Sequence, residues 1–159
     1  MRVLSAIGGG LAGATTLNIL HEFTRRFDKD APRMDLMGMD ALSKGLRKAG
    51  QPVPDQDSLY KLTLAGDLIS NTFYYSLAAA GKKKYVIPKG TFLGLAAGLG
   101  ALFLPEQLGL NPVHSNKNIK TQLLTTSFYL IGGLVASFVA KKIENRLSRS
   151  SEHQPHLWV

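Results

Sequence analysis

Long runs without charge alternate along the chain with short segments in which charges gather. Residues 3–20, 90–105 and 123–140 contain no Asp, Glu, Lys or Arg, and residues 62–81 contain one, Asp67. A helix on the surface of a soluble protein carries its charges along one face, at a spacing of about 3.6 residues. These runs have no such face, and their 16 to 20 residues approach the ~20 that cross a hydrocarbon core. The pattern predicts membrane-spanning helices.

Extended to their flanking residues, the runs predict an all-α, integral membrane four-helix bundle. The expected spans are residues 3–23, 59–81, 88–108 and 120–140, within a single membrane domain over residues 1–149. Residues 150–159 are expected to form a polar tail. The mean hydropathy of only +0.01 favours the alternative, a soluble all-α bundle with unusually apolar helices. The segregation of the charges favours the membrane interpretation.

The connection between the first two spans predicts one further helix, over residues 35–49. Its apolar residues recur at helical spacing, with charged residues on the other faces: Leu36, Met39, Leu42 and Leu46. Asp35 can cap its start, and Gly50 and Pro52 can end it. We expect an amphipathic helix on the membrane surface or, equally, one packed on the end of the bundle.

Small residues at every fourth position form ridges on three of the predicted spans. The glycines concerned are Gly9 and Gly13 in the first, Gly90, Gly94 and Gly98 in the third, and Gly132 in the fourth. Such ridges allow another helix to approach closely. They predict helix packing, either inside one bundle or against a second copy of the chain or another membrane protein.

Asp67 is the most informative residue, because a carboxylate within a membrane costs at least ~2.5–3.5 kcal/mol. Antiparallel packing of the first two spans would bring it to the depth of Asn18, roughly 7–10 Å below one surface at a rise of ~1.5 Å per residue. Two polar stripes share that depth: Thr15, Asn18, Glu22 and Arg25 on the first span, and Thr63, Asp67, Asn71 and Tyr74 on the second. Polar stripes are expensive against lipid, so they should face each other across a polar cavity.

This cavity supplies the candidate site. The expected solute- or ion-binding residues are Asp67, Asn71, Asn18 and Tyr129, and the expected cavity entrance is formed by His21, Glu22 and Arg25. Two interpretations remain open. The cluster can bind a solute, or Asp67 and Asn71 can act as structural hydrogen bonds between helices while Glu22 and Arg25 form an interfacial ion pair.

The net charge and the absence of known motifs disfavour several classes of function. The net charge of +8 comes from basic residues that flank the spans without a recognition motif, so we expect membrane lipids rather than nucleic acid as partners. Arg25 stands where a zinc-protease helix that began at His21-Glu22 would need its second histidine, so no metal site is expected. The chain has no cysteine and no dinucleotide or phosphate-loop fingerprint, so no cofactor is expected and an enzyme is disfavoured.

Basic residues are almost equally divided between the two sides of the predicted bundle, nine with the termini and ten opposite. The positive-inside rule is therefore nearly tied. The nine lie closer to the span ends and have few acids nearby, which favours cytoplasmic termini. The near tie also leaves open an antiparallel pair of copies.

Several short segments resemble uncharacterised small multi-pass bacterial inner-membrane proteins. They are Ala12-Gly-Ala14 with His21-Glu22, then Ala31-Pro-Arg-Met-Asp35, Ala65-Gly-Asp67 and Leu104-Pro-Glu106. The resemblance implies a multi-pass protein of the bacterial inner membrane and brings no activity with it. The expected function is transport or permeation of a small polar solute or cation; the alternative is a non-catalytic accessory or scaffold subunit of a larger membrane complex.

Overall fold

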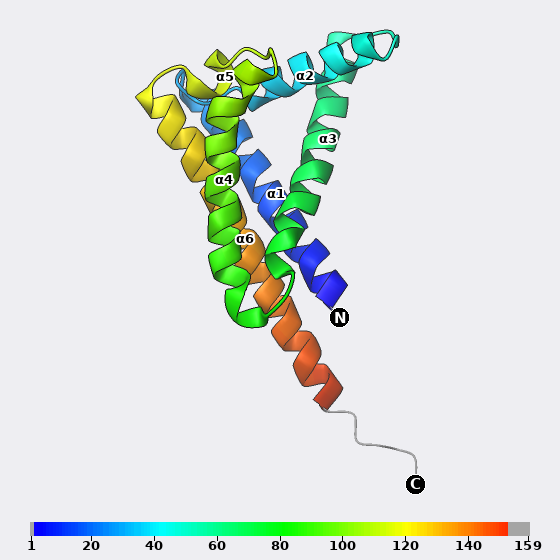
Figure 1. Ribbon diagram of the computed structural model, residues 1–159, viewed down its shortest axis with the longest axis vertical. Helices are drawn as coiled ribbons and strands as arrows, with labels where there is room; N and C mark the ends of the chain where they lie inside the picture. Colours follow the sequence, from blue (N-terminus) through cyan, green and yellow to red (C-terminus); the bar gives the residue numbers. More distant parts are fainter. Residues whose placement is uncertain (1, 153–159) are drawn as a thin grey trace.

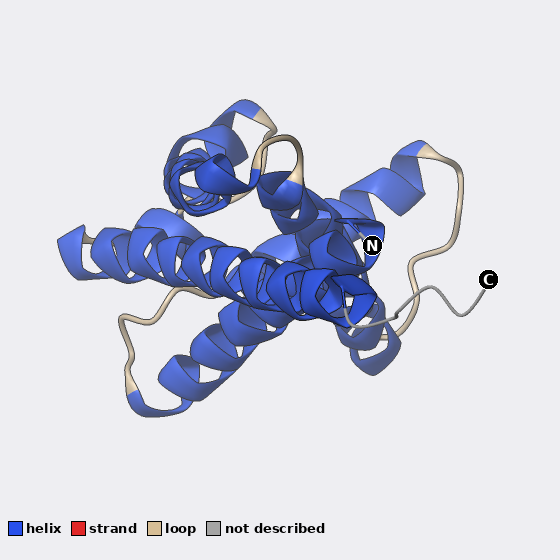
Figure 2. Cartoon of the chain, turned by 90° about the horizontal axis from the view of Figure 1, so that it is seen from below, coloured by secondary structure: helices blue, strands red, loops and turns tan. Residues whose placement is uncertain are grey.

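The computed structural model describes residues 2–152 as helices joined by short loops (Figure 2). Four helices are long: α1 (Arg2–Phe27), α3 (Gln56–Ser76), α4 (Val86–Gln107) and α6 (Ile119–Glu152). The shorter elements are α2 (Met34–Lys48), α5 (Val113–Asn116) and the 3-10 turns η1 (Leu77–Ala79) and η2 (Lys83–Tyr85). No strand occurs within residues 2–152, and the all-α prediction is confirmed there.

The long helices alternate in direction (Figure 1). α1 and α4 run towards the end of the molecule that carries α2 and α5, and α3 and α6 run back. We call the first the α2 end and the other the terminal end. α2 lies across the α2 end and bridges α1 and α3, which diverge there.

Three helices are long and apolar enough to cross a membrane, which indicates a membrane protein. The segments are Val3–Phe27, Lys83–Gln107 and Ile119–Arg149, and they contain or overlap three of the four expected spans. Within the described part of the chain, α3 is not among them. α3 contains most of the expected second span, with Asp67 in its centre.

α1 and α4 both pack against α6 through the predicted glycines. A Cβ atom at Gly9 would lie 2.5 Å from the carbonyl oxygen of Ala136, and one at Gly94 would lie 2.8 Å from the Cα of Leu130. The other glycines make similar approaches: Gly13 to the Gly132 carbonyl, Gly90 to the Gly133 carbonyl, Gly98 to the Thr126 Cα and Gly132 to the Tyr75 hydroxyl. The ridges therefore contact helices of the same chain.

The buried core lies where α1, α3 and α6 meet. It comprises Leu17, Tyr75, Phe128, Tyr129 and Ala136. The hydroxyl of Tyr75 is 2.8 Å from the carbonyl oxygen of Tyr129, to which it donates a hydrogen bond. This bond ties the C-terminal part of α3 to α6.

The loop between α1 and α2 is anchored by residues around the start of α6. Lys120 pairs with Asp28 at 2.7 Å, and the Asn118 amide donates to Asp30 at 3.0 Å. These hydrogen bonds hold the pKa values of Asp28 and Asp30 below their ordinary range. The anchored loop fixes where α2 begins.

The ends of α2 and α6 differ in part from the ends expected from the sequence. α2 follows Arg33, which makes no capping side-chain bond; Asp35 instead accepts hydrogen bonds from arginines, so its expected role as a cap is wrong. Gly50, with φ +69°, follows the end of α2 as expected. α6 continues to Glu152, so the start of the expected tail is helical, and the rest of the tail lies outside the described residues.

Candidate functional site

A pocket of about 510 Å³ lies between α1, α2 and α3, and we call it the α1–α3 pocket. Its walls are Thr15, Asn18, Ile19, His21, Glu22, Phe23, Arg25 and Arg26 of α1; Tyr60, Thr63, Leu64, Asp67 and Leu68 of α3; and Pro32, Met34, Asp35 and Gly38 from the loop and α2. Most members of the two predicted polar stripes therefore line one pocket.

The pocket forms where α1 and α3 diverge from their backbone contact at one end. Near the terminal end, a Cβ on Gly10 would collide with the carbonyl of Thr72 and with Ser76, so the two backbones are in contact. Towards the α2 end the helices diverge and α2 spans the gap (Figure 1). There Gly38 packs against Thr63, leaving no room for a Cβ.

Asp67 lies on the α3 wall and is half-buried. The side-chain amide of Asn71 donates a hydrogen bond of 2.9 Å to its Oδ1, and Asn18 makes a second side-chain hydrogen bond. Among the described side chains, none forms an ion pair with it. Asp67 is thus a carboxylate with amide neighbours and no cationic partner.

Two polar side-chain atoms of the pocket residues lack hydrogen-bond partners among the described residues. The Nε2 of His21 and the Oγ1 of Thr63 are buried, and neither has a hydrogen-bond partner among the described residues. The His21 ring packs edge-on against Phe128 and Tyr129, with ring centroids 5.2 Å and 5.9 Å away. Buried polar atoms are usually hydrogen-bonded, so these two are exceptions among the described residues.

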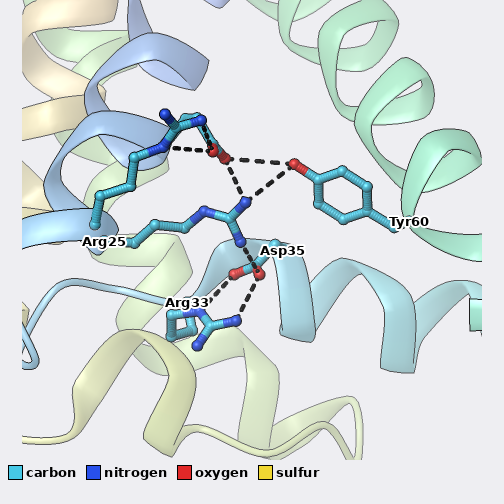
Figure 3. Close-up of polar contacts among 6 residues, drawn as sticks. Arg25, Arg33, Asp35 and Tyr60 are labelled. Carbon is cyan, nitrogen blue, oxygen red and sulfur yellow. Dashed lines mark hydrogen bonds and ion pairs between the residues drawn. The ribbon is translucent and has the colours of Figure 1, made fainter. Parts of the chain in front are cut away.

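Charged residues gather at the α2 end of the pocket (Figure 3). Arg25 pairs with Asp35 at 2.7 Å and with Glu22 at 2.6 Å, and its guanidinium lies 5.6 Å from the centre of the Tyr60 ring. Two more arginines complete this set: Arg33 pairs with Asp35 and Arg26 with Glu22, both at 2.8 Å. We call the six residues the mouth cluster.

The electrostatics of the mouth cluster keep Asp35 charged. Burial raises the pKa of Asp35, but the hydrogen bond from Arg33 and the charges of Arg33 and Arg25 outweigh it. The net result is a pKa below the ordinary range of a carboxyl group. At neutral pH the mouth cluster therefore contains three arginines paired with two carboxylates.

A second pocket of about 440 Å³ lies on the other side of the mouth cluster, and we call it the outer pocket. Both pockets are lined by Arg25, Asp35 and Tyr60. The remaining walls of the outer pocket are Arg33, Leu36, Met39, Gln56 and Asp57. The shared residues form a partition between the two pockets.

Most of the binding and entrance residues predicted from the sequence line the α1–α3 pocket. Asn18, His21, Glu22, Arg25 and Asp67 line the α1–α3 pocket, and Glu22 and Arg25 form the ion pair considered as an alternative. Asn71 reaches the site only through its bond to Asp67. Tyr129 is not part of the lining; it is buried behind the pocket, against the ring of His21.

The contributions of α2, of Arg33 before it and of Tyr60 on α3 were not predicted from the sequence. Arg33, Asp35, Gly38 and Tyr60 belong to the mouth cluster or the pocket wall. One signal was present, since Asp35 and Gly38 are three residues apart and share a helix face. Tyr60 likewise shares a face with Thr63 and Asp67.

The pocket can bind a ligand by hydrogen bonds and by the charge of Asp67. In the described part of the chain, no group of three or more His, Cys, Asp or Glu side chains could hold a metal ion.

No protein-family model matches the chain, and no curated protein or solved structure matches it either.

Proposed function

We propose that this chain is a four-span protein of the cell membrane, of the bacterial inner-membrane type, that binds and moves a small polar solute or cation. Asp67 is the binding carboxylate, Asn18 and Asn71 position it, and the mouth cluster controls access from the α2 end. α2 lies at the membrane interface in this proposal.

The direction of the helices supports α3 as the fourth span. α1 and α4 run in the same direction, and each is apolar enough to cross a membrane. If both cross, the chain between them has to return, and α3 is the helix that does so. Its 21 residues span about 30 Å at ~1.5 Å per residue, close to the thickness of a hydrocarbon core.

The observation that carries the proposal is a carboxylate without an ion-pair partner among the described residues, in a pocket between two helices that we propose to span the membrane. An intramembrane carboxylate is costly, and most are paired, hydrated or functional. Asp67 has amide neighbours and no cation. A bound cation or a proton would complete the site.

The closed end of the α1–α3 pair favours a carrier over an open pore. Beyond the pocket, Gly10 packs on Thr72 and Ser76, and Tyr75 is 1% exposed. The pocket therefore communicates with one side of the bundle. Release on the other side requires α1 and α3 to separate near Gly10.

The test is the thermal stability of the purified protein with a panel of ions and small polar solutes, across a pH series. We expect at least one solute to raise the melting temperature of the wild type but not of Asp67→Asn. Asp40→Asn is the matched control, because Asp40 is paired with Lys44 on α2 and lines neither pocket. Flux into vesicles should follow the same order, and flux retained by Asp67→Asn would contradict the proposal.

The second candidate is the accessory subunit, which one feature of α3 favours. Ala65 and Gly66 are exposed, and a Cβ on Gly66 would meet no atom within 4 Å. Another helix could approach here, whereas the glycine ridges of the other spans are covered by this chain itself. Gly66→Leu would then release a partner that co-purifies in mild detergent. Recovery of one polypeptide from wild-type membranes would count against this candidate.

A further inference from the structure

The charges that line the α1–α3 pocket leave one negative charge unmatched. Arg25 and Arg26 offset Glu22 and Asp35, to which they are paired. Arg33 also pairs with Asp35, but it lines the outer pocket and not the α1–α3 pocket. Asp67 remains, which makes the pocket complementary to a single positive charge.

The exposed surface of the pocket wall is mostly apolar, although ten of its seventeen residues are polar or charged. Ile19, Phe23, Leu64 and Leu68 line the pocket together with Met34. Ile19, Phe23 and Leu64 are also 61%, 63% and 44% exposed, so they form an edge of the pocket that opens to the outside of the molecule. If α1 and α3 cross a membrane, that edge faces the acyl chains.

The size of the pocket distinguishes between kinds of cation. Its volume of about 510 Å³ lies in the range of about 300–1,000 Å³ that holds drug-sized organic ligands. A bare metal ion needs several oxygen or nitrogen ligands. The described residues offer no group of three His, Cys, Asp or Glu side chains that could supply them. An organic ion with an apolar body matches both the volume and the wall.

We propose that the α1–α3 pocket binds lipophilic organic monocations, which enter from the membrane between α1 and α3 and pair with Asp67. This inference rests on the proposed function, names its class of solute and adds an entrance from the membrane to the one at the mouth cluster. A cation whose charge is covered by apolar groups loses little hydration in such a pocket, and the apolar wall favours its body.

Tetraphenylphosphonium and tetraphenylborate test the inference, because they share size and shape and carry opposite charges. Binding is measured by titration calorimetry on protein in lipid nanodiscs, with empty nanodiscs subtracted. We expect saturable binding of the phosphonium at one ion per chain, weakened about tenfold or more in Asp67→Asn and unchanged in Asp40→Asn. Equal binding of the borate, or full binding by Asp67→Asn, would overturn the inference.

A second measurement does not depend on the folding of an Asp67 variant. The chain has no cysteine, so Leu64→Cys and Leu62→Cys each introduce one thiol. Leu64 lines the pocket and Leu62 does not, yet they are 44% and 53% exposed on the same helix. Tetraphenylphosphonium should slow maleimide labelling at position 64 several-fold and leave position 62 unchanged. Equal protection, or none, would contradict the proposed location.

The two proposals can fail separately. If small hydrophilic ions stabilise the protein through Asp67 while tetraphenylphosphonium neither binds nor protects position 64, the inference fails and the proposed function stands. If neither class of solute acts through Asp67, both fail.

Discussion

The two halves of the α1–α3 pair consist of the same helices but are held together in different ways. In the closed half, towards the terminal end, backbone lies on backbone at Gly10, and the Ser76 hydroxyl donates to the carbonyl of Ala6 at 3.0 Å. In the open half, α1 and α3 diverge and α2 lies across the gap, and buried atoms of His21 and Thr63 have no partner among the described residues. The closed half contains small residues and satisfied hydroxyls, whereas the open half contains charged and polar side chains.

The difference shows how one helix pair can provide both rigidity and a site. Close backbone contact leaves no space for a ligand and tolerates no side-chain growth. Divergence of the same helices creates space, and the side chains that line it can then bind something other than each other. Substitutions in the two halves separate the role in rigidity from the role in forming a site.

The largest effect is expected in the closed half, from Gly13→Leu. A Cβ at this position would lie 2.5 Å from the carbonyl of Gly132 and 3.2 Å from the ring of Tyr75, so the added side chain cannot be accommodated without moving α6 or α3. We expect a loss of about 3 kcal/mol or more, measured by chemical unfolding in detergent.

Gly66→Ala is the control for that substitution. Gly66 is also helical, but nothing lies within 4 Å of its Cβ position. Alanine should therefore leave stability unchanged or raise it by about 0.5–1 kcal/mol. Equal destabilisation by both variants would mean that helix flexibility, not close packing, gives the closed half its stability.

An intermediate effect is expected from Tyr75→Phe. It removes the 2.8 Å bond to the carbonyl of Tyr129 at a site that is 1% exposed, and should cost about 1 kcal/mol. Tyr60→Phe removes two longer contacts at the partly exposed mouth cluster, one from Arg25 at 3.3 Å and one to Glu22 at 3.4 Å, and should cost about 0.5 kcal/mol or less. Thermal unfolding of the two variants gives the comparison, and the reverse order would contradict it.

The smallest effect concerns the pH dependence of the mouth cluster. The pKa of Asp35 is lowered by folding, so its contribution to stability is present above its unfolded pKa and is lost as the pH falls from about 4 through the folded value. Wild type should therefore lose more stability than Asp35→Asn between pH 6 and pH 3, as read from melting temperatures. Asp57→Asn, at an exposed pair with Lys61, serves as the control. Parallel curves for wild type and Asp35→Asn would contradict the assignment.

Several features were accessible from the sequence because they depend on local spacing. The uncharged runs predicted helices, and the described residues form helices joined by loops, with no strand among them. Helical spacing alone also placed Asn18, Glu22 and Arg25 on one face, and these residues do line the pocket. Tyr129 was placed by depth, and depth does not determine the rotation of a helix. Its side chain lies behind the pocket, in contact with His21.

By itself, the sequence determined which segments are helical and apolar, where small residues recur and which polar residues share a helix face. These properties follow from the period of the α-helix and from the cost of charge in an apolar environment. Only the tertiary structure decided that α6 contacts the glycines of α1 and α4, that Asp35 pairs with Arg25, and that Asp67 has no cation beside it. Such contacts depend on how each helix is tilted and rotated against its neighbours, which no local pattern specifies.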